Sequence, residues 1–201
     1  VRIKIANENI KSSAELARFM PVQTINPDTF KLLEGSPSLR RGFIDWGVFH
    51  VKHNEFFPVW KKMQTSLKQR NALLRQSSVS QSELSVWTNE FVKSASSVDR
   101  LRKDYIKQLL PHFHRILNEL CGLAAIGISY YRGWDKDKSL ADVLEKGLNR
   151  DMQYGYTSSG PQRADLRVVS EKESAVDRLS RGQLKLVVCA LKIAQGELLM
   201  Q

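Results

Sequence analysis

The residues most able to do chemistry stand near the end of the sequence, in the run Leu179-Ser180-Arg181-Gly182-Gln183-Leu184-Lys185. Ser180 and Gln183 have the spacing of a capping box, in which each side chain satisfies a free backbone N–H group at a helix start. Mostly apolar residues then recur at helical spacing, which predicts a helix with one buried face. The positions that share this face are Leu184, Val187, Val188, Leu191 and Gln195.

A glycine lies inside the first turn of this expected helix, where it costs up to about 1 kcal/mol relative to alanine. Gly182 would be favoured there if another molecule must approach the backbone closely. The free N–H groups and positive dipole end of a helix form a natural anion site, and Arg181 and Lys185 add positive charge beside it. The alternative is an ordinary capped core helix that ends at Gly196. The residues alone leave both interpretations open.

The sequence lacks the motif with which a phosphate-cleaving NTPase holds its nucleotide. Gly122 and Gly127 have the spacing of a P-loop, but Ile128-Ser129 follows where Lys-Ser or Lys-Thr is required. No apolar strand ending in Asp-Glu, which would hold Mg²⁺ and water, follows the expected helix. We therefore expect that this chain does not hydrolyse ATP by itself.

Two histidine pairs have spacings that are compatible with metal binding. His50 and His53 stand three residues apart, and His112 and His114 flank Phe113. Because no carboxylate–histidine ligand set accompanies either pair, packed or solvated histidines are the favoured interpretation. No metal site is predicted.

Composition limits the class of protein. The chain has 201 residues, enough for one or two domains, and 42% of them are hydrophobic. Its net charge of +10 at pH 7 favours a polyanionic partner, with nucleic acid ahead of a membrane. Cys121 and Cys189 belong to no CxxC or Cys/His cluster, so we expect free thiols in a cytosolic protein.

Neither a signal peptide nor an apolar run near the ~18 residues of a membrane span is visible. No membrane partner is therefore expected. The sequence begins with the alternating pattern of a strand and reads as a fragment of a longer protein.

Long helices dominate the middle of the sequence. They are predicted over 36–53, 55–75 and 82–110, and Pro111 should kink or restart the path into 112–121. The helices over 55–75 and 82–110 are joined by a short polar turn and should form an antiparallel αα-hairpin. One face of the 55–75 helix carries no acid after Glu55, so it is either solvated or turned toward phosphates. Its basic residues are Lys61, Lys62, Lys68, Arg70 and Arg75.

Short alternating segments flank these helices. Strands are predicted over 1–6, 22–25, 126–130 and 165–170, short helices over 28–33 and 139–147, and an extended polar stretch over 151–158. Residues 1–25 and 122–201 would then form one mixed α/β layer, interrupted by a helical insertion over 26–121. The expected fold class is α+β, predominantly helical.

The run from Leu179 to Lys185 resembles the signature motif of ABC-type ATPases. More specific blocks resemble the RecF family of bacterial DNA replication and repair proteins, and their order fits over nearly the whole chain. These blocks are Met20-Pro21-Val22-Gln23, Asn26-Pro27, Leu32-Leu33, Gly35-Ser36-Pro37, Arg40-Arg41-Gly42-Phe43-Ile44-Asp45-Trp46, Lys68-Gln69-Arg70-Asn71 and Tyr156-Thr157-Ser158-Ser159-Gly160-Pro161-Gln162-Arg163-Ala164-Asp165-Leu166. One position departs from the family pattern, because Gln162 replaces the usual histidine of Gly-Pro-His-Arg.

The resemblance implies that residues 1–25 and 122–201 are part of an SMC-like, ABC-type ATPase head without its Walker A and Walker B motifs. Residues 26–121 would be a helical second lobe. The signature of one subunit would close over the γ-phosphate of a nucleotide held by the P-loop of another subunit. The signature residues are Ser180, Arg181, Gly182, Gln183 and Lys185. Gln23 would match the Q-loop glutamine, which senses Mg²⁺ and the γ-phosphate.

The resemblance also implies a function in recombinational gap repair, as part of the response to DNA damage. The full-length protein would be a weak ATPase of the bacterial cytoplasm, with ATP and Mg²⁺ as cofactors. It would form an ATP-dependent homodimer on duplex DNA and on single-strand/duplex junctions, and help RecO and RecR to load RecA. The candidate DNA contacts are Arg40, Arg41, Lys61, Lys62, Lys68 and Arg70. The alternative function is a helical protein–protein interaction module that keeps no nucleotide role.

Overall fold

The structure is a computed structural model that describes residues 4–5, 8–9, 12–76, 78–122, 126–171 and 173–200. Its helices are α1 (Ser13–Phe19), α2 (Lys31–Glu34), α3 (Pro37–Val51), α4 (His53–Leu74), α5 (Gln81–Cys121), α6 (Leu140–Lys146), α7 (Leu148–Tyr154), α8 (Ala175–Arg178) and α9 (Arg181–Leu199), with 3₁₀ turns η1 (Pro27–Phe30) and η2 (Pro161–Arg163). Its strands are β1 (Lys4–Ile5), β2 (Glu8–Asn9), β3 (Ile126–Tyr131), β4 (Asp165–Ser170) and β5 (Glu173–Ser174).

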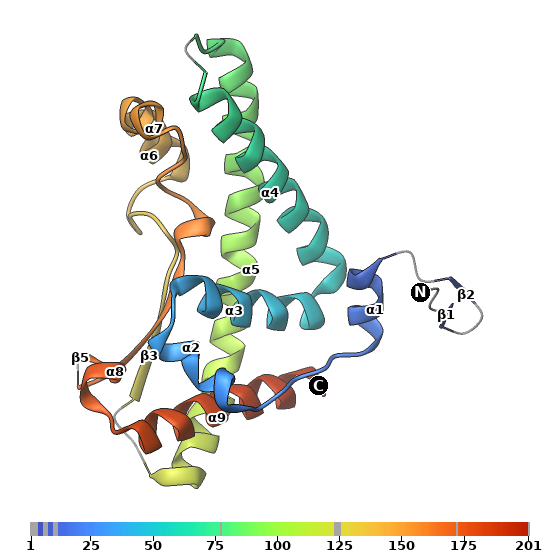
Figure 1. Cartoon of the computed structure of the whole chain (residues 1–201), viewed down its shortest axis with the longest axis vertical. Helices are drawn as coiled ribbons and strands as arrows, with labels where there is room; N and C mark the ends of the chain where they lie inside the picture. Colours follow the sequence, from blue (N-terminus) through green and yellow to red (C-terminus); the bar gives the residue numbers. More distant parts are fainter. Residues whose placement is uncertain are drawn as a thin grey trace.

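Helix α5 is the axis of the molecule (Figure 1). Its 41 residues make a rod about 60 Å long. The Ser80 hydroxyl caps its start by accepting a hydrogen bond from the Glu83 N–H, and Gly122 ends it with a left-handed φ of +62°. Helices α3, α4, α6 and α9 all contact α5, so the core of the protein follows this one helix.

Pro111 does not interrupt α5, which runs unbroken from Gln81 to Cys121, so the path does not restart as a separate helix over 112–121. A proline inside a helix removes one backbone hydrogen bond and costs about 3 kcal/mol. On either side of it, Leu109 and Phe113 are fully buried, whereas Pro111 itself faces outward. Burying large apolar side chains gains about 1.5–3 kcal/mol each, which is enough to hold the helix together through the proline.

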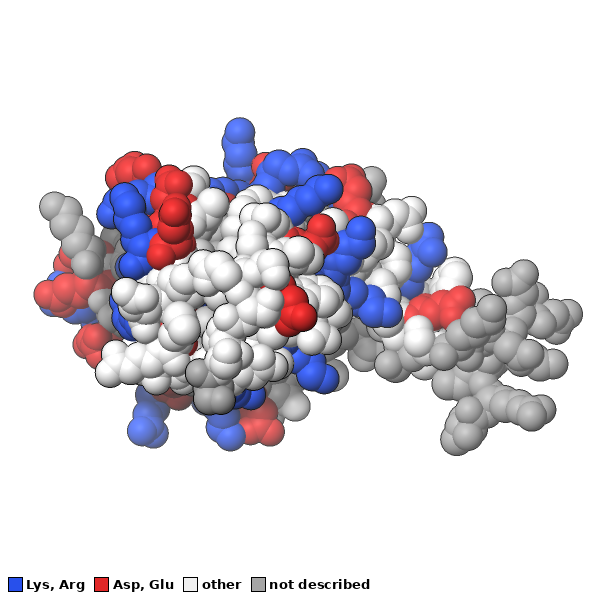
Figure 2. Space-filling model, turned by 90° about the horizontal axis from the view of Figure 1, so that it is seen from above, with Lys and Arg blue, Asp and Glu red and all other residues white. Residues whose placement is uncertain are grey.

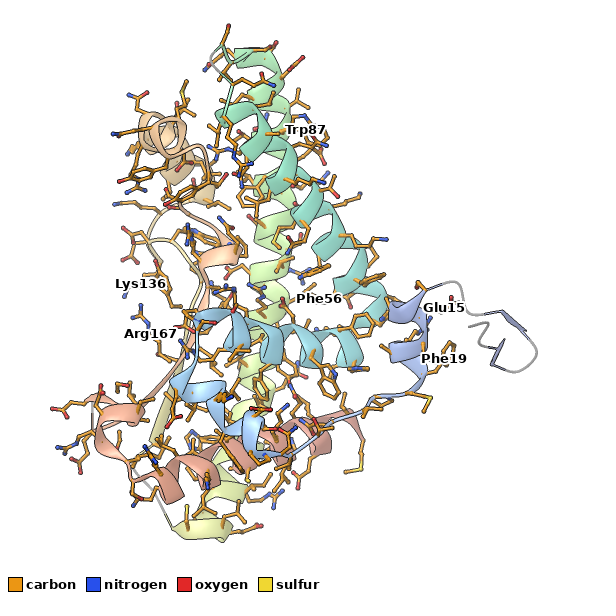
Figure 3. The ribbon with its side chains drawn as sticks, viewed as in Figure 1. Glu15, Phe19, Phe56, Trp87, Lys136 and Arg167 are labelled. Carbon is orange, nitrogen blue, oxygen red and sulfur yellow. The ribbon has the colours of Figure 1, made fainter. Side chains whose placement is uncertain are left out.

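Helices α4 and α5 form the expected antiparallel αα-hairpin, which makes the upper part of the molecule in Figure 1. Phe56, Met63 and Leu73 of α4 are buried, as are Leu84 and Phe91 of α5. Figure 3 shows Phe56 near the foot of the hairpin and Trp87 close to its tip. The fold class is therefore the predominantly helical one that the sequence predicts.

Helix α9 packs across the lower end of α5 (Figure 1). The face predicted from helical spacing is buried: Val187, Val188 and Leu191 have no exposed surface, and Gln195 is 1% exposed. The apolar stripe of α9 therefore belongs to the main core, while Ser180, Arg181 and Gly182 at the start of the helix are exposed.

A small antiparallel sheet in the order β3-β4-β5 lies beside α5. Ile126 pairs with Ser170 and Tyr131 with Asp165, in a continuous register. Alternation along β4 buries Leu166 and Val168, while Arg167 faces outward. The predicted strands over 126–130 and 165–170 are therefore confirmed.

Two predicted segments have different structures. Residues 20–25 have no regular secondary structure, and Val22 and Ile25 are exposed, because no described strand lies beside them to pair with. The stretch over 151–158 is not extended: α7 covers its first part, ends at Gly155 with φ +68°, and turns the polar side chain of Asp151 inward. Of the strand expected over 1–6, Lys4–Ile5 pairs with β2, and the other positions lie outside the described residues.

Candidate functional site

The first turn of α9 has the geometry that the capping box predicts. The Gln183 N–H donates to Ser180 Oγ at 3.3 Å, and the Ser180 N–H donates to Gln183 Oε1 at 2.9 Å. The N–H groups of Arg181 and Gly182 have no acceptor among the residues that the structure describes. Because these donors point away from the start of a helix of 19 residues, the positive end of its dipole is open to an anion.

Packing inside the chain does not require the glycine in this turn. A Cβ placed on Gly182 would meet only Ser180 Oγ, at 3.9 Å. By contrast, a Cβ on Gly47 would overlap the Tyr105 side chain, and one on Gly133 would overlap the Gly160 carbonyl. Gly182 therefore leaves open space over the backbone, which is what the close approach of an external group needs.

The surroundings of the tip are basic. Ser180, Arg181, Gly182 and Lys185 are exposed, and the first turn of α9 contains no acidic residue. The Lys185 ammonium lies 5.4 Å from the centre of the Phe30 ring, which holds its charge beside the tip. The open N–H donors, the free space and the positive charge together suit a phosphate group.

Gln23 lies at the other end of the same helix. Its Nε2 donates to Gln195 Oε1 at 2.9 Å, and the Gln195 amide donates in turn to the Phe43 carbonyl and the Tyr105 hydroxyl, each at 2.9 Å. Gln195 is fifteen residues beyond Ser180, or about 22 Å along α9. The structure therefore does not bring Gln23 and the signature residues together within one chain.

The two adjacent arginines proposed as DNA contacts are used inside the fold. Arg40 forms a bidentate pair with Asp165, with Nε–Oδ1 and Nη2–Oδ2 distances of 2.6 and 3.0 Å, and its Nη1 donates to the Leu33 and Gly35 carbonyls at the end of α2. Arg41 is partly buried and donates to the Ala164 carbonyl at 2.9 Å. Burial, and then the nearby Arg102, lower the pKa of Arg41. These contacts join α3 to residues 164–165 at the start of β4, so both side chains already have partners within the chain. The assignment of Arg40 and Arg41 to DNA stays a prediction.

Arg70 is also not a surface residue. It is 1% exposed, and its Nη1 donates to Asp151 Oδ2 at 2.9 Å and to the Thr157 hydroxyl at 2.6 Å. Its Nε donates to the Thr88 hydroxyl at 3.1 Å. Grouping Arg70 with the exposed basic residues of α4 was wrong: it is seven residues after buried Met63 and four before buried Leu74, so it lies on the buried side of the helix, where α7 and the loop after it supply its partners.

Arg102 completes a set of arginines that hold the segment 151–165. It pairs with both oxygens of Asp45, at 2.7 and 2.9 Å, and donates to the Pro161 carbonyl at 2.8 Å. Burial by itself would lower the pKa of Arg102, but the Asp45 carboxylate raises it above its ordinary value. Sequence reasoning missed this residue. The sequence held one hint: both partners of Arg102, Asp45 and the Gly160-Pro161 turn, lie in blocks that resemble the same family.

Three of the six proposed DNA contacts remain accessible. Lys61, Lys62 and Lys68 are exposed on α4, and the Lys61 ammonium lies 5.3 Å from the centre of the Phe57 ring. Arg75, at the end of α4, is exposed as well. Figure 2 shows the molecule from above, with Lys and Arg side chains around its rim and acidic side chains between several of them. The positive charge is therefore distributed in local groups, and the α4 face is one of them.

Within the described ranges, no three His, Cys, Asp or Glu side chains come together as a group that could hold a metal ion. The rings of His50 and His53 pack against Phe49 instead. No helix in the part of the chain that the structure describes is long and apolar enough to cross a bilayer.

No family model matches the chain. Among curated proteins, the DNA replication and repair protein RecF of Pseudomonas putida is 50% identical over 199 residues, which cover 99% of this chain and 54% of that protein. The protein of the same name from Azotobacter vinelandii is 50% identical over 198 residues, covering 98% of this chain and 54% of that protein. The chain thus spans about half the length of the curated relatives that it matches.

Two solved structures share the fold. The recombination mediator protein RecF-ATP in the RecFOR pathway superimposes with a TM-score of 0.90 at 21% identity, covering 100% of this chain and 56% of that one. RecF-ATPrS, from the same pathway, superimposes with a TM-score of 0.86 at 21% identity, covering 98% and 56%. Together with the order of the sequence blocks and the geometry of the α9 tip, the 50% identity shows that the chain belongs to the RecF family of DNA replication and repair proteins.

Proposed function

We propose that this chain is the signature-bearing part of a RecF protein that dimerises on DNA when it binds ATP. The observation that carries the proposal is the first turn of α9, where exposed Gly182 has open space above it and free N–H donors beside it. A triphosphate held by a second copy of the protein would meet this turn. The dimer would then require the α9 tip of each copy to face outward.

The α9 tip can bind a phosphate without losing its cap. The Ser180 hydroxyl accepts one hydrogen bond from Gln183, and its own proton remains available to a phosphate oxygen. The Arg181 and Gly182 N–H groups and the Lys185 ammonium would add further donors. ATP would supply the triphosphate that joins the two copies, and Mg²⁺ would neutralise part of its charge. Because the sequence contains no GxxxxGK[ST] motif, the P-loop would have to lie elsewhere in the protein.

DNA would bind to the helical part of the molecule. Exposed Lys61, Lys62 and Lys68 lie on α4, while the α9 tip lies at the opposite, lower end (Figure 1). The proposed division is a partial ATPase head over 1–25 and 122–201 and a helical lobe over 26–121. In recombinational gap repair, the ATP-bound dimer would recognise single-strand/duplex junctions in the bacterial cytoplasm and help RecO and RecR to load RecA.

The test is Ser180→Arg in the full-length protein, with mass measured by light scattering in the presence of ATPγS. We expect the variant to remain monomeric while it still binds nucleotide, because the P-loop is separate from this turn. Ser139→Arg is the matched control: Ser139 is an exposed N-cap that accepts a hydrogen bond from the Asp142 N–H at 3.1 Å. Both variants lose a cap worth about 1 kcal/mol, but only the first should lose the dimer. Normal dimerisation of Ser180→Arg would reject the proposal.

A further inference from the structure

A pair of exposed aromatic rings lies at the C-terminal end of α7. The rings of Tyr154 and Tyr156 are stacked, with their centres 5.6 Å apart and their planes 16° from parallel. Tyr154 is 54% exposed and Tyr156 is 38% exposed. Gly155 stands between them with φ +68°, a conformation that glycine adopts without strain. The turn thus presents two parallel rings to solvent.

Arginines surround this tyrosine pair. The Arg163 guanidinium lies 5.2 Å from the centre of the Tyr156 ring, Arg75 Nε donates to the Gly155 carbonyl at 3.1 Å, and Arg150 donates to the Ser158 hydroxyl at 2.8 Å. None of the three forms an ion pair with a described acid. The only acid between Lys146 and Ala164 is Asp151, and its charge is already matched by buried Arg70. The tyrosine pair therefore has beside it three arginines that form no ion pair with a described acid.

The tyrosine pair continues a line of positive charge along α4. Lys61, Lys68 and Arg75 are seven residues apart, so they lie almost in line on one side of the helix. All three are exposed. The line is about 21 Å long, close to six steps of a duplex strand at about 3.4 Å each. Its last member, Arg75, contacts the turn that holds the two rings.

We propose that Tyr154 and Tyr156 stack against an unpaired nucleotide of a DNA whose duplex part lies along Lys61, Lys68 and Arg75. Aromatic side chains bind unpaired bases by stacking, and adjacent arginines bind the phosphates on either side. Bases inside a duplex present no free ring face, so the tyrosine pair would add affinity only where a strand is unpaired. The site would therefore give the protein its preference for a junction over a blunt duplex. This inference rests on the proposed DNA-binding function.

The experiment measures the affinity of the full-length protein for a blunt duplex and for the same duplex with a short single-stranded overhang. The overhang carries 2-aminopurine at its first unpaired position, because stacking quenches the fluorescence of this base. In Tyr154→Ala/Tyr156→Ala, we expect the overhang to bind about tenfold more weakly, from the loss of one stacked base. Quenching should disappear, and the affinity for the blunt duplex should not change. Tyr154→Phe/Tyr156→Phe keeps both rings and should behave as the unmodified protein.

Tyr131→Ala is the matched control. Tyr131 is 37% exposed and has the Arg167 guanidinium 4.7 Å from its ring centre, but no second ring from the described residues is stacked on it. Arg167 lies on the outer side of the sheet, well below α7 in Figure 3. This variant removes an exposed tyrosine beside an arginine at another place, and it should leave the overhang affinity and the quenching unchanged.

The ratio of overhang to blunt-duplex affinity separates this inference from the proposed function. If the alanine variant keeps the ratio and the quenching of the unmodified protein, the stacking site is overturned, whatever the lysines contribute. If the same variant binds both DNAs normally but binds RecR or RecO more weakly, the tyrosine pair belongs to a protein interface, and the inference is overturned equally. Blunt-duplex binding that does not depend on Lys61 and Lys68 would count against the lysine line, and a tyrosine-dependent ratio would still support the stacking site.

Discussion

The tip of α9 and the segment 151–165 both carry blocks typical of the family, yet their polar groups are used in opposite ways. At the tip, the Arg181 and Gly182 N–H groups have no described acceptor and the surface above them is open. In the segment 151–165, carboxylates and carbonyls bind Arg40, Arg41, Arg70 and Arg102. A site for an external ligand keeps its hydrogen-bond donors free, whereas a segment that holds the fold together has its polar groups paired within the chain. Resemblance of sequence does not separate these two uses.

The cost of leaving a group unpaired explains the difference. An arginine that is removed from water needs hydrogen-bonded acceptors, because an uncompensated buried charge costs several kcal/mol. Arg70 and Arg102 are 1% and 2% exposed and are paired with Asp151 and Asp45. Donors at an exposed helix end are satisfied by water until a ligand replaces it. The α9 tip can therefore remain free at little cost.

The largest expected effect is on the free energy of unfolding, when the buried pair of Arg70 and Asp151 is broken. Arg70→Ala leaves the Asp151 carboxylate buried without its partner, so we expect a loss of about 3–5 kcal/mol in the free energy of unfolding, measured by urea denaturation. Lys68→Ala, two positions away on the exposed side of α4, is the matched control and should change it by less than about 0.5 kcal/mol. If the two variants lowered the free energy of unfolding equally, the buried pair would stabilise the fold no more than an exposed lysine does.

An intermediate effect is expected on DNA binding. Lys61→Glu/Lys68→Glu removes two phosphate contacts, so the slope of log K against log salt concentration should decrease by about 1.8. At low salt, we expect duplex affinity to fall at least about tenfold in a gel-shift assay, because two repulsive charges are added as well. Lys136→Glu/Arg167→Glu makes the same change of charge on the outer side of the sheet (Figure 3) and should have a much smaller effect. Similar effects of both variants would assign DNA binding to net charge alone.

The smallest expected change in stability comes from a substitution at Gly182, which separates the role of the α9 tip in dimerisation from its role in folding. Gly182→Ala should raise the free energy of unfolding by up to about 1 kcal/mol, because the added Cβ meets nothing closer than 3.9 Å. It should nevertheless weaken ATP-dependent dimerisation, which light scattering measures. Gly42→Ala is the matched control, since a Cβ there has no neighbour within 4 Å and Gly42 lies inside α3. A tip variant that dimerises as well as the Gly42 variant would show that the open space is not used.

Local patterns predicted the structures that depend on neighbours in sequence. The capping box at Ser180 and Gln183, the buried face of α9 and the αα-hairpin all follow from spacing, and the structure has each of them. Predictions failed where distant contacts decide. Helix α5 continues through Pro111, with buried residues on either side of it. The first part of the polar stretch 151–158 is helical, and the Asp151 carboxylate is turned inward to Arg70.

The arginines show most clearly that local sequence patterns do not reveal contacts with distant segments. Arg70 and Lys68 lie two residues apart on one basic helix. Helical spacing places Arg70 seven residues after buried Met63 and four before buried Leu74, so it indicates burial for Arg70, but it does not reveal that Asp151 and Thr157 are the partners of the guanidinium. Periodicity, caps and motif order determined the helices, the α9 tip and the family. Only the tertiary structure decided which charges remain free, because the pairing of a charge depends on elements such as α7 that are far away in sequence and adjacent in space.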